Sequence, residues 1–217
     1  MSASNYDLQV DIARQLFLTY DQELLIRKFR LKADKQWLYL RYLSREHRIS
    51  RSTGKIEERL SDGWWECRDY GTVMTVCDLL CFSPGERLPA LANTWCSVGT
   101  FVVTGITETE DFTRRYANVF AGRPEKLRAA CVALGGQLLP PMAGADLTCR
   151  FSVTSFFPVL LQFWEGDEEF PPKLLVLWDR NTDKFMHFET TFYLQGDLLC
   201  RLKEKLPGDT GAAAASK

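Results

Sequence analysis

Two short runs that are apolar on both faces constrain most strongly how this chain can fold. Residues 156–164 are apolar at nearly every position apart from Gln162, and residues 174–178 are wholly apolar. A strand with one buried face alternates apolar and polar residues, whereas a strand without that alternation belongs in the middle of a covered sheet. These runs therefore predict two central strands, joined by an acidic loop and covered by helices.

The first third of the chain shows helix-like and then strand-like patterns. Residues 5–28 have apolar residues at helical spacing, with Ile12, Leu16, Phe17 and Tyr20 on one predicted face, and Asp21 can begin a second short helix. Residues 28–60 contain four strand-like segments separated by turn-like residues, which predict an antiparallel meander. We expect a loop over residues 61–67, followed by a helix that Asp69 caps.

The remainder of the chain alternates strands with helices. A strand is predicted near residues 94–103, and helices over residues 110–120 and 124–135, the latter with Pro at its start and Gly at its end. Residues 147–153 alternate like a strand, and residues 190–205 predict a last helix. The class is α+β, with mostly antiparallel sheets on which N-terminal, central and C-terminal helices pack.

Length and composition indicate one large domain. The chain has 217 residues, of which 46% are hydrophobic and 25% charged, and its formal net charge is -1. We expect a single α+β domain over residues 1–206 and a flexible C-terminal tail over 207–217. The absence of a cationic excess argues against a nucleic-acid partner. Without a signal peptide, a membrane span or a paired cysteine framework, we expect a cytoplasmic protein with reduced thiols.

The most unusual segment is the acidic loop WEGDEEFPP, residues 164–172. Carboxylates crowded between two buried strands require cations, hydrogen-bond donors or a metal to stay charged. Oxygen ligands with one imidazole would suit a divalent ion, or the same cluster could bind a ligand. The alternative is a solvated hairpin loop. The residues predicted to converge are Asp167, Glu168, Glu169, Asp179, His187 and Glu189.

A second candidate is the arginine series around residues 41–51. Arg48 and Arg51 carry guanidinium groups, which match the geometry of phosphate and carboxylate. The alternative is that these arginines pair with the acidic loop or are solvated on an outer strand.

Common enzyme signatures do not occur in the sequence. There is no GxxxxGK[ST], no GxGxxG after a strand, no GxSxG and no HExxH. The only histidines are His47 and His187, so a histidine-based triad has few candidate members. No cofactor can be assigned from these patterns.

Several blocks of the sequence resemble an uncharacterised family, a domain of unknown function found mainly in anaerobic, clostridial-type bacteria. The resemblance covers nearly the whole chain except the tail. Some relatives look fused to iron–sulfur cluster modules, which implies a link to anaerobic redox or one-carbon metabolism. This chain lacks the clustered cysteines of such a module, so it should not bind a cluster by itself. The blocks are residues 39–58, 75–83, 116–136, 156–182 and 185–194.

Two functions follow as hypotheses. The first is a soluble binding or accessory protein with an acidic ligand or metal site in the 164–172 region, serving a protein partner in an anaerobic metabolic complex or binding a small molecule. The alternative is an enzyme of unidentified class that uses the same carboxylate and histidine cluster. We expect neither nucleic acid nor membrane as a partner.

Overall fold

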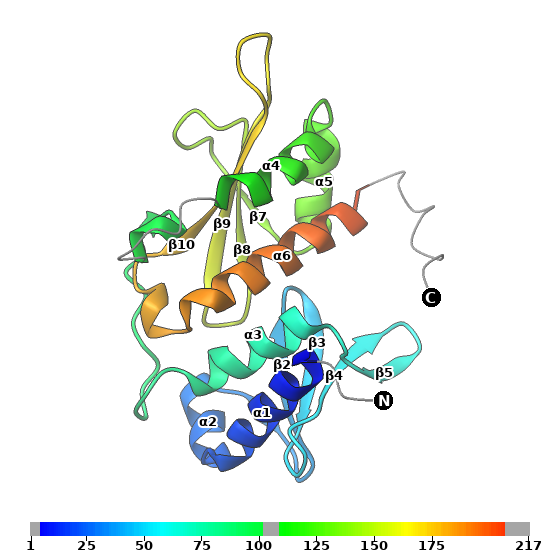
Figure 1. The fold of residues 1–217 in the computed structure, drawn as a ribbon, viewed down its shortest axis with the longest axis vertical. Coiled ribbons are helices and arrows are strands. Elements are labelled where there is room, and N and C mark those ends of the chain that lie inside the picture. The colour runs from blue at the N-terminus through cyan, green and yellow to red at the C-terminus, as the bar shows by residue number, and fades with distance from the viewer. Residues whose placement is uncertain (1–4, 102–108, 207–217) are drawn as a thin grey trace.

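The structure is a computed structural model that describes residues 5–101 and 109–206. This part of the chain contains two five-stranded antiparallel sheets and six α-helices, which confirms the α+β prediction (Figure 1). The helices are α1 (Asn5–Thr19), α2 (Gln22–Phe29), α3 (Tyr70–Cys81), α4 (Thr109–Phe120), α5 (Pro124–Ala133) and α6 (Phe188–Glu204), with 3-10 turns at Val98–Phe101 and Thr182–Lys184.

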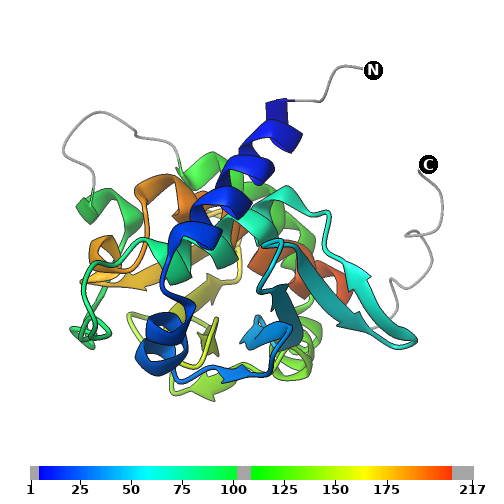
Figure 2. The ribbon, with the colours of Figure 1, turned by 90° about the horizontal axis from the view of Figure 1, so that it is seen from below.

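The first sheet is the predicted antiparallel meander. Its strands follow chain order: β1 (Lys32–Ala33), β2 (Trp37–Tyr42), β3 (Arg45–Ser50), β4 (Ile56–Leu60) and β5 (Gly63–Glu66). Figure 2 shows the hairpin of β4 and β5 extending away from the helices.

The prediction of a loop over residues 61–67 is wrong, because Gly63–Glu66 forms strand β5. Trp64 lies opposite Arg59 in the ladder, and Trp65 lies opposite Glu58. The Arg59 guanidinium also lies over the Trp64 ring, 5.6 Å from its centroid. These cross-strand contacts stabilise the hairpin. The polar residues at the start of the segment had indicated a loop instead.

The second sheet has the order β6-β10-β9-β8-β7. Strand β9 is buried along nearly its whole length between β8 and β10, which confirms the prediction of a central covered strand. Helices α4 and α5 contact this sheet, and α6 crosses in front of it (Figure 1). The strands are β6 (Trp95–Cys96), β7 (Gln137–Leu139), β8 (Leu147–Ser152), β9 (Pro158–Trp164) and β10 (Lys173–Asp179).

Two further predictions need correction. The strand expected near residues 94–103 is only the two residues of β6, followed by a 3-10 turn, and positions 102–103 lie outside the described residues. On α1, Phe17 is buried as expected, but Ile12 and Leu16 are about half exposed. The buried face of α1 instead pairs Ala13 with Phe17, because α1 packs against α3 along that line.

A tight turn within the first sheet makes hydrogen bonds to residues next to the second sheet. Leu43 and Ser44 join β2 to β3, and both have positive φ, 44° and 63°. This backbone conformation normally favours Gly or Asn. Tertiary contacts hold it here, since the Leu43 N–H donates to the Val153 carbonyl (2.8 Å) and the Ser44 hydroxyl donates to the Leu134 carbonyl.

A buried polar network joins the first sheet to α3 and α6. The Tyr42 and Thr72 hydroxyls each donate to Asp197 Oδ2 at 2.7 Å. The Arg201 guanidinium donates to the Tyr42 and Leu43 carbonyls at 3.3 Å. Burial raises the pKa of the Asp197 carboxyl to about 6. The apolar side chains around this network form one buried cluster with members from both sheets.

No helix in the described part of the chain is long and apolar enough to cross a membrane. The tail predicted over residues 207–217 lies outside the described residues.

Candidate functional site

The acidic loop between β9 and β10 is exposed to solvent. Asp167, Glu168 and Glu169 are all exposed. The Asp167 carboxylate accepts hydrogen bonds from the Phe170 and Glu169 N–H groups, at 2.7 and 2.8 Å, and these donors lower the pKa of Asp167. Asp167 therefore stabilises the loop itself, and the segment has the geometry of the solvated hairpin loop that was the alternative.

Asp179 lies at the opposite end of β10 from this loop. A seven-residue strand rises about 3.3 Å per residue, so the two ends are roughly 20 Å apart. Asp179 is buried, and its carboxylate accepts three backbone N–H groups, from Ala92 (2.9 Å), Asn93 (2.7 Å) and Asn181 (2.9 Å). Asp179 and the acidic loop therefore lie at opposite ends of β10, and the prediction that they converge is wrong for Asp179.

His187 and Glu189 lie at the start of α6, which Figure 1 places well away from the loop between β9 and β10. Both line a cavity of about 560 Å³ between α1, α3 and α6. Asp78 of α3 accepts the His187 N–H (2.8 Å), contacts His187 Nδ1 (2.6 Å) and accepts the Thr190 hydroxyl (2.6 Å). The Asp78 carboxylate thus caps α6 and fixes the imidazole ring.

This His–Asp pair lacks an activated thiol. Cys77 and Cys81 line the same cavity, but both are buried. Burial raises the pKa of the Cys77 thiol to about 12 and raises that of Cys81 as well. Both sulfurs are protonated at neutral pH, so neither is a ready nucleophile.

The structure thus separates the six predicted residues into three places. Within residues 5–101 and 109–206, no three His, Cys, Asp or Glu side chains are grouped so that they could hold a metal ion. The predicted convergence of carboxylates and histidine does not occur.

A double substitution tests whether the acidic loop has only local importance. Replacing Glu168 and Glu169 by Gln should shift the melting temperature by less than about 2 °C, since both side chains are exposed. Asp167→Ala should lower it further, because two backbone N–H groups lose their acceptor. Thermal unfolding followed by circular dichroism measures both. A large loss in the double variant would show that these acids have a tertiary partner.

Arg48 and Arg51 are held by neighbouring side chains. Arg48 pairs with Glu57 of β4 and lies over the rings of Trp37 (4.0 Å) and Trp64 (4.6 Å). Arg51 pairs with Glu23 of α2 (2.6 Å) and also donates to Gln22 and to the Asp34 carbonyl. Their partners are these nearby groups and not the acidic loop, so these arginines act as cross-links within the first sheet and to α2.

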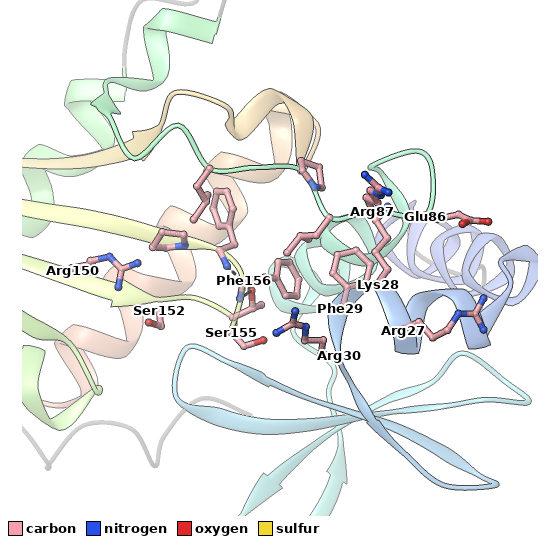
Figure 3. Close-up of a pocket in the computed structure, with 16 residues that line it drawn as sticks. Arg27, Lys28, Phe29, Arg30, Glu86, Arg87, Arg150, Ser152, Ser155 and Phe156 are labelled. Carbon is pink, nitrogen blue, oxygen red and sulfur yellow. Dashed lines mark hydrogen bonds between the residues drawn. The ribbon is translucent and has the colours of Figure 1, made fainter.

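A different place gathers unneutralised positive charge: a cavity of about 710 Å³ between α2, the loop after α3 and the turn between β8 and β9 (Figure 3). We call it the basic cleft. Its charged lining comprises five cations and one carboxylate: Arg27, Lys28, Arg30, Arg87, Arg150 and Glu86.

One wall of the basic cleft is the loop over residues 82–94, which hydrogen bonds hold in place at both ends. At its start, the buried Lys28 ammonium donates to the carbonyls of Ser83 (2.6 Å) and Gly85 (3.1 Å). At its end, Asp179 accepts the Ala92 and Asn93 N–H groups. Asp179 therefore positions a wall of the cleft and does not face a ligand.

The opposite wall comes from the second sheet. Arg150 and Ser152 lie on β8, and Ser155 and Phe156 lie in the turn that follows. The Phe156 ring packs on Phe29 of α2, with centroids 4.7 Å apart. This aromatic contact joins the turn to α2, which also lines the cleft.

Within the described part of the chain, no carboxylate pairs with a cation of the cleft. Among the described residues, none of the five forms an ion pair, whereas Arg14, Arg45, Arg48 and Arg51 each pair with a glutamate. Burial lowers the pKa of Lys28, as expected for an ammonium that only carbonyls surround. An excess of positive over negative charge in a cleft creates a potential that attracts anions.

Arg30 occupies a strained backbone position at one edge of this site. It follows α2 with φ 52° and ψ 44°, the left-handed conformation in which helices usually end on Gly. A side chain there costs about 1 kcal/mol. The conformation directs Arg30 toward Ser155, and Arg150 extends from the other wall (Figure 3). The strain is consistent with a functional role for this guanidinium.

The sequence offered little signal for the basic cleft. Its cations come from three separate segments, at residues 27–30, 87 and 150, which together span more than 100 residues of the chain. Only RKFR at residues 27–30 forms a visible basic cluster, at the end of the predicted helix.

The fold and the cleft define this chain as an α+β protein with two antiparallel sheets and a basic cleft between α2, the loop after α3 and the second sheet. A family model described as "Domain of unknown function (DUF3786)" matches residues 21–201, which include every residue that lines the cleft. The chain belongs to the DUF3786 family. No curated protein and no solved structure matches the sequence.

Proposed function

We propose that this protein binds a small-molecule anion in the basic cleft. The observation that supports the proposal is a cavity of about 710 Å³ whose charged lining is five cations and one carboxylate. Ligand sites typically measure 300–1,000 Å³. Guanidinium groups bind phosphate and carboxylate through paired hydrogen bonds, so Arg30 and Arg150 would hold the anionic group.

Arg30→Gly is the most informative test. The substitution removes the guanidinium and relieves the left-handed strain, so we expect the unfolding free energy to stay within about 1 kcal/mol of wild type. The affinity for pyrophosphate should fall about tenfold or more, because a charge-assisted hydrogen bond is worth at least about 1.5 kcal/mol. Isothermal titration calorimetry measures the affinity, and urea unfolding measures the stability.

Arg68→Gln is the matched control, since Arg68 is exposed and lies outside the basic cleft. It should bind pyrophosphate as wild type does. Equal affinity in all three proteins, or no heat and no thermal shift with phosphate, pyrophosphate and citrate, would contradict the proposal.

An accessory role toward a protein partner in an anaerobic metabolic complex stays a prediction, supported only by the resemblance noted in the sequence. Anion binding is compatible with either a binding protein or an enzyme. A pull-down from native lysate with and without the bound anion would test whether a stoichiometric partner exists.

A further inference from the structure

A second cavity adjoins the basic cleft. It measures about 500 Å³ and lies against the first sheet, bounded by β2, β3 and the hairpin of β4 and β5. The two cavities share a boundary made of Arg30, Thr154, Ser155 and Phe156. Arg30 and Ser155 are the exposed members of this boundary, so Arg30, with its strained backbone, lies between the two cavities.

The second chamber also carries an excess of cations. Lys32, Arg41 and Arg59 line it together with Arg30, against the single carboxylate of Glu46. Arg59 and Glu46 are 3.8 Å apart, and both side chains are more than half exposed, so this ion pair is weak. Positive charge therefore continues from the basic cleft past Arg30 and along the first sheet.

The size of the two chambers bears on the ligand. A single phosphate would occupy only a small part of either cavity, and it could not contact Arg150 in one and Arg59 in the other. An elongated anion with a charge at each end would use both sets of cations and would pass Arg30 on the way.

We infer that the ligand is an elongated molecule with several phosphate groups, which extends from the basic cleft past Arg30 into the second chamber. This inference rests on the proposed function, because it requires an anion in the first chamber. Such a chain of phosphates could belong to inorganic polyphosphate or to a nucleotide, and both share the chemistry that the arginines recognise.

The test compares orthophosphate with inorganic triphosphate by calorimetry at 0.15 M ionic strength, where the Debye length is about 8 Å and distant charges contribute little. Wild type should bind triphosphate about tenfold or more tightly than orthophosphate. Arg41→Gln combined with Arg59→Gln should remove most of that gain and leave orthophosphate affinity within about twofold. Arg150→Gln should weaken both ligands.

The matched control is Arg68→Gln combined with Arg180→Gln, which removes the same charge from exposed positions outside both chambers. It should keep the full preference for triphosphate. If triphosphate binds no more tightly than orthophosphate, or if the gain survives in the Arg41 and Arg59 variant, the inference is overturned while the proposed function stands. If neither ligand binds, the proposed function fails as well. Tighter binding of adenosine triphosphate than of triphosphate would identify a nucleotide as the source, and weaker binding would identify an inorganic chain.

Discussion

Asp179→Ala should lower the unfolding free energy by about 3 kcal/mol and also weaken anion binding. The buried carboxylate accepts three backbone N–H groups, from Ala92, Asn93 and Asn181. Each donor that loses a charged acceptor costs at least about 1 kcal/mol. Because the first two donors belong to the wall of the basic cleft, the loop that carries Arg87 should lose its fixed position.

Urea unfolding and pyrophosphate titration of the same variant measure the two effects. The unfolding free energy of Asp179→Asn should lie between those of wild type and Asp179→Ala, since the amide oxygen of Asn can still accept some of the three backbone N–H groups. Asp183→Ala is the matched control: Asp183 is an exposed carboxylate four positions along the chain, and its removal should cost less than about 0.5 kcal/mol. A stable Asp179→Ala variant with normal pyrophosphate affinity would show that the wall does not depend on this carboxylate.

The second large effect is a pH dependence that Asp197 imposes on stability. Burial raises the pKa of this carboxyl from 3.8 to about 6. Its contribution to stability is therefore fully present below the unfolded pKa and is lost as the pH rises through about 6. The shift corresponds to at most about 3 kcal/mol, since one pKa unit is worth 1.36 kcal/mol.

Asp197→Asn should remove this dependence. The difference in unfolding free energy, variant minus wild type, should rise by about 2–3 kcal/mol between pH 4 and pH 7, because only wild type must ionise a buried group over that range. Tyr42 and Thr72 keep an acceptor in the variant. Asp183→Asn, in which an exposed carboxylate is neutralised, should show a nearly constant difference. A constant difference for Asp197→Asn would mean that Arg201 holds the carboxylate ionised throughout.

Local sequence patterns predicted those helices and strands whose formation depends on residues close together in the sequence. Asp21 and Asp69 cap α2 and α3 by accepting N–H groups two or three positions further on, and this geometry is contained in a few residues. The apolar run of residues 156–164 identified β9, because burial on both faces needs a continuous apolar segment. The run of residues 174–178 also identified a strand, β10, but its residues alternate between buried and half-buried, so the prediction of burial on both faces was wrong for this strand. The β5 strand was missed because Trp64 packs against residues of other strands, under the guanidinium groups of Arg48 and Arg59.

The candidate site illustrates the opposite case. The acids of residues 167–169 attracted attention because charge is dense there, yet exposed carboxylates need no counter-charge. His187 was grouped with them by sequence distance, whereas α6 begins near the far end of the second sheet from that loop (Figure 1). The prediction of one domain over residues 1–206 and that of a cytoplasmic location stay predictions.

The sequence by itself determined the α+β class, the meander, the central strands and the helix starts, because these depend on periodicity and on contacts a few residues long. Only the tertiary structure decided where charge is left uncompensated. Arg30 and Arg150 line the same cleft because a turn of the second sheet packs on the end of α2 through Phe156 and Phe29. Whether a given arginine has a glutamate partner or faces an open cavity depends on such packing, and no local pattern along the chain records it.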